Sequence, residues 1–133
     1  MIKLFDPPRD EDCLRSVIEV FRSGTWATGS GGPWVAGFEN EFNRYIGSLY
    51  TVAVNSGSSA LHLALRSIPC NGRKVLLPSL GFVSAAHAIR DAGAEPVFVD
   101  IDEYSLNLST SDLVQKATAD TSAILVVHFA GRP

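Results

Sequence analysis

The 133-residue sequence predicts an α/β fold in which helices cover a partial parallel sheet. Candidate strands and helices alternate along the chain from residue 50 onward. The candidate strands are also continuous apolar runs, VLL, VFV and AILVV, which are typical of strands buried on both faces of a parallel sheet. We therefore expect a single domain over 1–133, with N-terminal helices and a Gly/Trp loop over 1–49 and βα repeats over 50–133.

Residues 1–49 predict two amphipathic helices separated by a loop. Apolar side chains recur at helical spacing in each, at Leu14, Val17, Ile18 and Phe21 and again at Phe38, Phe42, Tyr45 and Ile46, before Gly47. The loop between them, 23–35, is rich in glycine and contains Trp26 and Trp34. Either both rings pack on the surface of their own domain, or the loop closes over a ligand or a partner subunit.

Residues 50–133 predict four strands with helices between them. The strands are expected at Tyr50–Val54, Lys74–Leu77, Pro96–Val99 and Ala123–His128, and the helices around Leu61–Ile68, Phe82–Asp91 and after Ser109. Few residues follow the last strand, so an edge and an apolar face would be exposed. We expect either a longer protein or a partner that covers this face.

Composition excludes several classes of function. Eleven basic and fourteen acidic residues give a net charge of -3 without a basic run, which argues against a nucleic-acid partner or a membrane-surface patch. The two cysteines, Cys13 and Cys70, form neither a CxxC pair nor a disulfide framework. The charged N-terminus does not match a signal peptide, and the apolar run 123–127 is too short to span a bilayer. We expect a cytoplasmic protein with no membrane partner.

The junction after the first candidate strand suits an anion. Gly57 permits a sharp turn, and Ser58 and Ser59 open a helix whose free N–H groups and positive dipole end favour negative charge. Side chains no larger than serine also let a phosphate approach the backbone. The alternative is that Ser56 or Ser58 only caps the helix, which is a common role for serine.

Two further strand ends carry side chains suited to a ligand. Phe82 stands at the start of a helix, where its ring would either stack on a planar cofactor or join the core. Asp100 and Asp102 follow the third strand and would serve as acid or base, although acids at such positions usually take part in turns.

Other kinds of site are excluded by spacing. The sequence contains neither a GxxxxGKS/T phosphate loop nor a GxSxG elbow, and the glycines within 29–32 do not follow a strand as a dinucleotide fingerprint requires. His62, His87 and His128 lack the spacing of metal ligands, so we expect no metal site and interpret all three as structural.

Six ordered stretches resemble the N-terminal part of the DegT/DnrJ/EryC1/StrS sugar aminotransferases. They are GTWATG, FENEFNRYIG, SGSSALHLAL, PSLGFVSAAHAI, GAEPVFVDIDEYSLNL and AILVVHFAGRP. The resemblance implies half of the large domain of a fold-type I enzyme that uses pyridoxal 5'-phosphate. Such enzymes transfer an amino group from glutamate or glutamine to a keto group of a nucleotide-linked sugar, and they work as dimers. We therefore expect a homo-oligomer.

The resemblance implies cofactor-binding roles for four residues. Gly57, Ser58 and Ser59 match the turn that holds the cofactor phosphate, and Phe82 matches the aromatic residue that stacks on the pyridine ring. Gly81 stands where the family usually has threonine, and Ser58 stands where threonine is common. These two departures concern affinity more than the existence of the phosphate site.

The family's Schiff-base lysine, in an SxxK motif, and the acid that pairs with the pyridinium nitrogen have no counterpart in this sequence. Lys3, Lys74 and Lys116 do not match the lysine motif. Because the lysine attaches the cofactor and transfers protons, we expect no catalytic residue, no activity of this chain alone and poor cofactor retention.

Two other functions remain open from the sequence. A non-enzymatic binding or assembly module would retain the aminotransferase fold and pair through its open edge. A small enzyme of flavodoxin-like topology would instead hold a nucleotide at Ser58 and Ser59. A downstream segment with an SxxK lysine would distinguish the aminotransferase from the assembly module.

Overall fold

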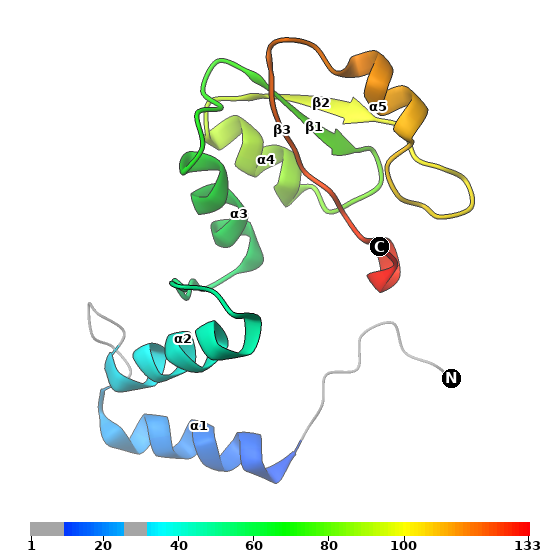
Figure 1. The fold of residues 1–133 in the computed structure, drawn as a ribbon. Coiled ribbons are helices and arrows are strands. Elements are labelled where there is room, and N and C mark those ends of the chain that lie inside the picture. The colour runs from blue at the N-terminus through cyan, green and yellow to red at the C-terminus, as the bar shows by residue number, and fades with distance from the viewer. Residues whose placement is uncertain (1–9, 26–31) are drawn as a thin grey trace. The chain divides into compact units, whose positions relative to one another are not determined.

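The structure, a computed structural model, describes residues 10–25 and 32–133, and the chain divides into two compact units, Met1–Ala53 and Val54–Pro133. The first unit contains α1 (Glu11–Ser23) and α2 (Gly32–Ile46). The second contains α3 (Gly57–Arg66), β1 (Lys74–Pro78), α4 (Ser84–Asp91), β2 (Glu95–Val99), α5 (Thr110–Lys116), β3 (Thr121–Ile124) and a 3-10 turn at Phe129–Gly131 (Figure 1). The predicted α/β class is confirmed. No helix within these described ranges could cross a membrane.

Capping residues set the ends of both helices of the first unit. The Asp10 carboxylate accepts a hydrogen bond from the Cys13 amide at 2.7 Å and so caps α1, which ends at Gly24 with φ 68°. The helix α2 ends before Gly47, as predicted, with φ 71° at that glycine. The helix α2 begins at Gly32, within the range expected to be a loop. Its second residue is Pro33, and proline is compatible with the first turn of a helix.

Trp34 is bound within its own unit. Its indole Nε1 donates to the hydroxyl oxygens of Ser23 and Thr25, each at 3.2 Å. These contacts join the end of α1 to the start of α2, as expected for a ring that packs on its own domain. Trp26 lies outside the described residues.

The strand predicted at Tyr50–Val54 is not present, so that prediction is wrong. The backbone here bonds to side chains of α2 instead of to another strand: the Ala53 amide donates to Glu39 Oε1 at 2.8 Å. The Thr51 hydroxyl likewise bonds to Asn43 Oδ1. A β-rich composition requires a pairing partner to form a strand, and the described sheet supplies none to these residues.

The sheet of the second unit has three parallel strands in the order β2-β1-β3. Leu76 at the centre of β1 pairs with Val97 of β2 and with Ile124 of β3. The chain therefore passes from β1 to β2 and returns past β1 to reach β3. Right-handed crossovers then require α4 and α5 to lie on opposite faces of the sheet, as they do in Figure 1.

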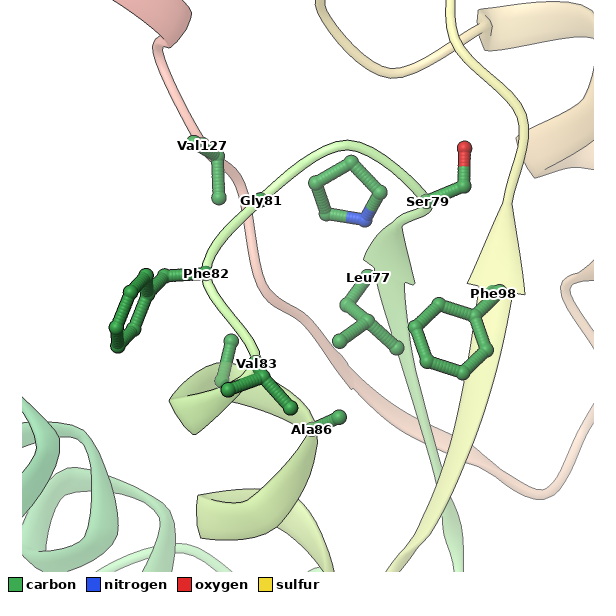
Figure 2. A pocket seen from close by; sticks show the side chains of 10 residues that line it. Leu77, Ser79, Gly81, Phe82, Val83, Ala86, Phe98 and Val127 are labelled. Carbon is green, nitrogen blue, oxygen red and sulfur yellow. The ribbon is translucent and has the colours of Figure 1, made fainter.

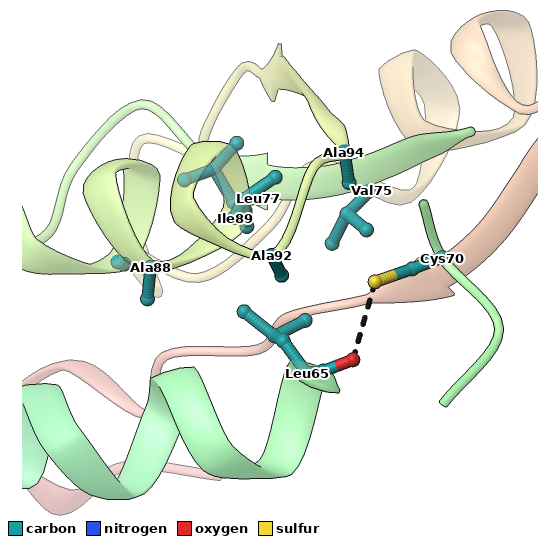
Figure 3. Packing of buried hydrophobic residues seen from close by; sticks show 9 residues of the cluster. Leu65, Cys70, Val75, Leu77, Ala88, Ile89, Ala92 and Ala94 are labelled. Atoms are coloured by element: carbon teal, nitrogen blue, oxygen red, sulfur yellow. Dashed lines mark hydrogen bonds between the residues drawn. The ribbon is translucent and has the colours of Figure 1, made fainter. Parts of the chain in front are cut away.

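Apolar packing fixes α3 and α4 on the same face of the sheet. Val75 and Leu77 of β1 are buried in one cluster with Leu65 of α3 and Ile89 of α4 (Figure 3). The free thiol of the buried Cys70 donates to the Leu65 carbonyl oxygen at 3.2 Å, where the chain leaves α3. Because α4 follows the carboxyl end of β1 and α3 packs beside it, this core determines where the N-terminal turns of both helices lie.

Candidate functional site

The first turn of α3 leaves backbone donors open. Ser56 caps the helix, because its hydroxyl accepts a hydrogen bond from the Ser59 amide at 3.1 Å. Within the described part of the chain, the amides of Gly57 and Ser58 have no acceptor. The first turn also contains no acidic residue. A helix of this kind presents two N–H donors and a positive dipole end to an anion.

The side chains around this turn leave the two donors accessible. A Cβ placed on Gly57 would have no heavy atom within 4 Å, so the space beside it is open. Ser58 is exposed, whereas the Ser59 hydroxyl donates to Asn55 Oδ1 at 2.9 Å. The capping role considered for Ser56 or Ser58 thus belongs to Ser56, and the Ser58 hydroxyl stays available for a ligand.

A cavity of about 320 Å³ joins the first turns of α3 and α4. Ser58, Ser59 and Ser84 line it at the helix starts, and His62, His87 and Asp91 line it further along the two helices. The structure thus brings the predicted phosphate turn next to the start of α4, two residues after Phe82. The two histidines, interpreted from the sequence as structural, face this cavity, and no spacing signal pointed to it.

Phe82 is exposed rather than part of the core. The residue retains 78% of its accessible surface, and in Figure 2 its ring projects away from Leu77 and Phe98. An exposed phenylalanine beside an open helix start adds little to folding stability. The ring is available to stack on a planar group, which was one of the two roles considered for it.

An apolar cavity of about 240 Å³ lies beneath the turn that carries Phe82. Leu77, Phe98 and Val127 line it together with residues of the turn and of α4 (Figure 2). A Cβ placed on Gly81 would meet Val127 Cγ2 at 3.7 Å, an ordinary contact. The packing around Gly81 therefore has room for a Cβ, so steric crowding does not explain why glycine stands where the resemblance predicts threonine.

Asp100 and Asp102 stabilise turns and do not reach either cavity. Asp102 Oδ1 accepts from the amides of Tyr104 at 3.1 Å and Ser105 at 2.8 Å, and Asp100 Oδ1 accepts from the next amide in the chain. The pKa of Asp102 is lowered, chiefly by the Ser105 amide and to a smaller extent by the charge of Arg132. A lowered folded-state pKa means that this turn contributes stability at neutral pH, which is lost as the pH falls below about 4 through that pKa.

The described lysines lie away from the Phe82 turn or are already bound. Lys74 stands at the amino end of β1, opposite the end that leads to Phe82. Lys116 Nζ lies 2.8 Å from Asp112 Oδ2 and 2.9 Å from the carbonyl oxygen of Phe98. Neither amine is placed to react with a group held at the start of α3.

We expect pyridoxal phosphate followed by borohydride to give no stoichiometric lysine adduct on this chain. Peptide mapping by mass spectrometry measures the label at each lysine. A single stoichiometric adduct on Lys74 or Lys116 that disappears in Phe82→Ala would contradict the lysine placement described above.

Comparisons with known proteins converge on one family. Residues 7–133 match the model of the DegT/DnrJ/EryC1/StrS aminotransferase family. The chain is 38% identical over 136 residues to a dTDP-4-dehydro-2,3,6-trideoxy-D-glucose 4-aminotransferase of Saccharopolyspora spinosa, which covers 100% of this chain and 34% of that protein. It is 42% identical over 120 residues to a spore coat polysaccharide biosynthesis protein of Bacillus subtilis, covering 90% of this chain and 30% of that protein.

Solved structures give the same result. A sugar aminotransferase of Micromonospora echinospora matches with a TM-score of 0.85 at 35% identity, over 100% of this chain and 36% of that one. A Streptococcus pneumoniae protein described as a sugar aminotransferase, solved in its PLP-form, matches with a TM-score of 0.88 at 30% identity, over 99% of this chain and 33% of that one. The chain thus spans about a third of the length of these relatives.

Proposed function

The chain belongs to the DegT/DnrJ/EryC1/StrS aminotransferase family, and from this premise we propose that it forms the phosphate-binding and ring-stacking part of a pyridoxal 5'-phosphate site. The enzyme to which this part belongs transfers an amino group from glutamate or glutamine to a keto group of a nucleotide-linked sugar. The observation that carries the proposal is the open first turn of α3, which shares a cavity with the start of α4 just beyond the exposed Phe82.

The residues present fit the cofactor. The free amides of Gly57 and Ser58 match the acceptor oxygens of a phosphate, and the absence of an acid from the first turn of α3 avoids repulsion. The exposed Phe82 ring supplies an apolar face for a planar heterocycle. A structural relative at 30% identity is known in a PLP-form, which supports the same choice of cofactor.

Each residue of the site would have a distinct task. The amides of Gly57 and Ser58 would hold the phosphate, and the Ser58 hydroxyl would donate one more hydrogen bond. Ser59, bound to Asn55 Oδ1, would keep the turn in shape, and Phe82 would cover one face of the ring. When bound, pyridoxal phosphate supplies the electron sink for amino-group transfer. The amine and the acid that the chemistry also requires would come from outside the residues described.

The same proposal places the enzyme in the cytoplasm, where free thiols stay reduced. Both cysteines of the chain, Cys13 and Cys70, are free thiols. The substrate class is inferred from the relatives, one of which is a dTDP-sugar 4-aminotransferase and another a GDP-perosamine synthase of Escherichia coli.

We also expect the protein to self-associate. Large apolar side chains of α1 and α2 are exposed, including Val17 at 66% and Phe38 at 55%, and the strands β2 and β3 lie at the edges of the sheet. Exposed apolar surface of this kind usually marks an interface. Sedimentation velocity over a wide concentration range should show a dimer or larger species. A strictly monomeric protein at the highest concentration would count against this expectation.

Co-expression tests the proposed function. The chain is produced together with the segment of a related aminotransferase that carries the lysine and the acid. We expect the two parts to co-purify with pyridoxal phosphate and to catalyse glutamate-dependent amination of a nucleotide-linked keto-sugar. An assembled pair that retains the cofactor but aminates no such sugar would refute the substrate class.

A further inference from the structure

Two segments of the second unit are joined near the carboxyl ends of the strands. The side chain of Asn107, in the loop after β2, donates from Nδ2 to the carbonyl oxygen of Arg132 at 3.2 Å and accepts at Oδ1 from the Phe129 amide at 3.4 Å. In return, Arg132 Nη1 donates to the carbonyl oxygen of Tyr104 at 3.2 Å. We call these three hydrogen bonds the Asn107 latch.

The latch connects two stretches with unfavourable backbone. Leu106 has a φ of 60° and Ala130 a φ of 54°, both in the left-handed region that side chains with a Cβ rarely adopt. Such conformations persist only where surrounding contacts fix them. Each strained residue is adjacent or close to a residue whose backbone or side chain takes part in the latch. The hydrogen bonds thus hold a geometry that the local sequence alone disfavours.

The segment after β3 that the latch holds lies beside the turn that carries Phe82. Val127, two residues before Phe129, lies beside Gly81, where a Cβ would be 3.7 Å from Val127 Cγ2. Val127 and Phe82 also line the same apolar cavity (Figure 2). Fixing the segment after β3 therefore fixes one wall against which the Gly81–Phe82 turn rests.

Side-chain contacts add few other restraints to the turn. Phe82 is 78% exposed, and α4 starts after Val83 without a hydrogen bond from a capping side chain. The backbone of the turn is tied at its start by the Ser79 amide, which donates to the Val99 carbonyl oxygen at 2.8 Å, and at its end by the Phe82 carbonyl oxygen, which accepts from the Ala85 amide at 3.1 Å. Between these two bonds, the proximity of Val127 to Gly81 restrains the path of the backbone and so the direction in which the Phe82 ring leaves it.

We propose that Asn107 is a positioning residue for Phe82: the latch holds Val127 against the Gly81 turn, and this contact aims the ring at the cofactor. The proposal rests on the proposed function, in which Phe82 stacks on pyridoxal phosphate. It assigns a role in the cofactor site to a residue that follows β2, whereas Phe82 follows β1 and Ser58 lies in the first turn of α3. Asn107 itself lines neither of the two cavities described above.

A double-mutant cycle on the assembled pair tests this role by equilibrium binding. Phe82→Ala, Asn107→Ala and the double variant are titrated with pyridoxal phosphate and, separately, with inorganic phosphate. Asn107→Ala should weaken binding of pyridoxal phosphate about threefold to fivefold while leaving inorganic phosphate unaffected, since only the ring contact is misaligned. In the Phe82→Ala background the Asn107 substitution should have no further effect.

Matched variants separate this role from general loss of structure. Asn43 of the first unit likewise uses its side-chain amide, whose oxygen accepts from the Ser48 and Thr51 hydroxyls. Asn43→Ala should leave the affinities for pyridoxal phosphate and for inorganic phosphate unchanged. Asn107→Asp keeps an acceptor for the Phe129 amide but replaces the donor to Arg132 with a carboxylate oxygen, which repels the Arg132 carbonyl oxygen. It should weaken pyridoxal phosphate binding at least as much as Asn107→Ala, and it serves if the alanine variant does not fold.

Each alternative result has a defined meaning. Equal losses for pyridoxal phosphate and inorganic phosphate, an undiminished effect in the Phe82→Ala background, or no loss in any Asn107 variant would refute the positioning role alone. If Phe82→Ala itself left pyridoxal phosphate binding unchanged, both the stacking role in the proposed function and the positioning role would be refuted.

Discussion

Replacing Ser58 and Ser59 together with glutamate should abolish binding of pyridoxal phosphate, weakening it by more than about a hundredfold. Two carboxylates would then stand in the first turn of α3, where the wild-type chain has no acid. They would repel the phosphate and would also occupy the open space in front of the Gly57 and Ser58 amides. Binding is measured by the absorbance change of the cofactor on titration with the assembled pair described above.

The matched control introduces the opposite change in charge at an acid that lies outside both cavities. Asp102→Asn alters the turn after β2, whose carboxylate bonds to the Ser105 and Tyr104 amides. It should lower thermal stability at neutral pH and, because the Tyr104 carbonyl oxygen of this turn belongs to the Asn107 latch, weaken cofactor binding by no more than about threefold to fivefold, the loss expected for Asn107→Ala. If the glutamate pair retained the cofactor as well as the parent does, the phosphate would bind elsewhere, and the roles of Gly57, Ser58 and Ser59 would be wrong.

Phe82→Ala should weaken pyridoxal phosphate binding about tenfold without destabilising the fold. Because the side chain is 78% exposed, its removal should change the free energy of unfolding by less than about 0.5 kcal/mol. Ile89→Ala provides the contrast, since Ile89 is 0% exposed within the core and its truncation should cost about 2–4 kcal/mol. Urea unfolding and cofactor titration of the same samples measure the two quantities.

A second aromatic truncation controls for loss of exposed surface. Tyr45 of α2 is 87% exposed, and Tyr45→Ala should leave cofactor affinity unchanged. Equal weakening by both substitutions would show that exposed rings affect binding non-specifically. A large loss of stability in Phe82→Ala would instead show that the ring supports the core, the other role considered for it.

Local signals in the sequence predicted much of the fold. The runs expected as strands at Lys74–Leu77 and Pro96–Val99 became β1 and β2, and helical spacing located α1 and α2. The strand expected at Ala123–His128 is displaced, because β3 is Thr121–Ile124 and the rest of that run is not strand. The strand expected at Tyr50–Val54 failed for a physical reason, because a strand is stable only with a partner, and pairing is not encoded in local composition. The Thr51 and Ala53 segment bonds to α2 instead.

The candidate site was accessible to sequence reasoning only in part. Glycine and serine after an apolar run located the start of α3, but the sequence alone did not decide which serine caps the helix; the hydrogen bond to Ser56 does. The cavity shared by α3 and α4 and the Asn107 latch depend on residues distant along the chain. Contacts such as that of Asn107 with Arg132 arise from tertiary packing, for which no local motif exists.

A crystal structure of the assembled pair with pyridoxal phosphate decides whether this chain holds the phosphate and one face of the ring. We predict phosphate oxygens within hydrogen-bonding distance of the Gly57 and Ser58 amides and the pyridine ring stacked on Phe82. A phosphate bound away from the first turn of α3, with Phe82 still exposed to solvent, would show that the cofactor site lies elsewhere.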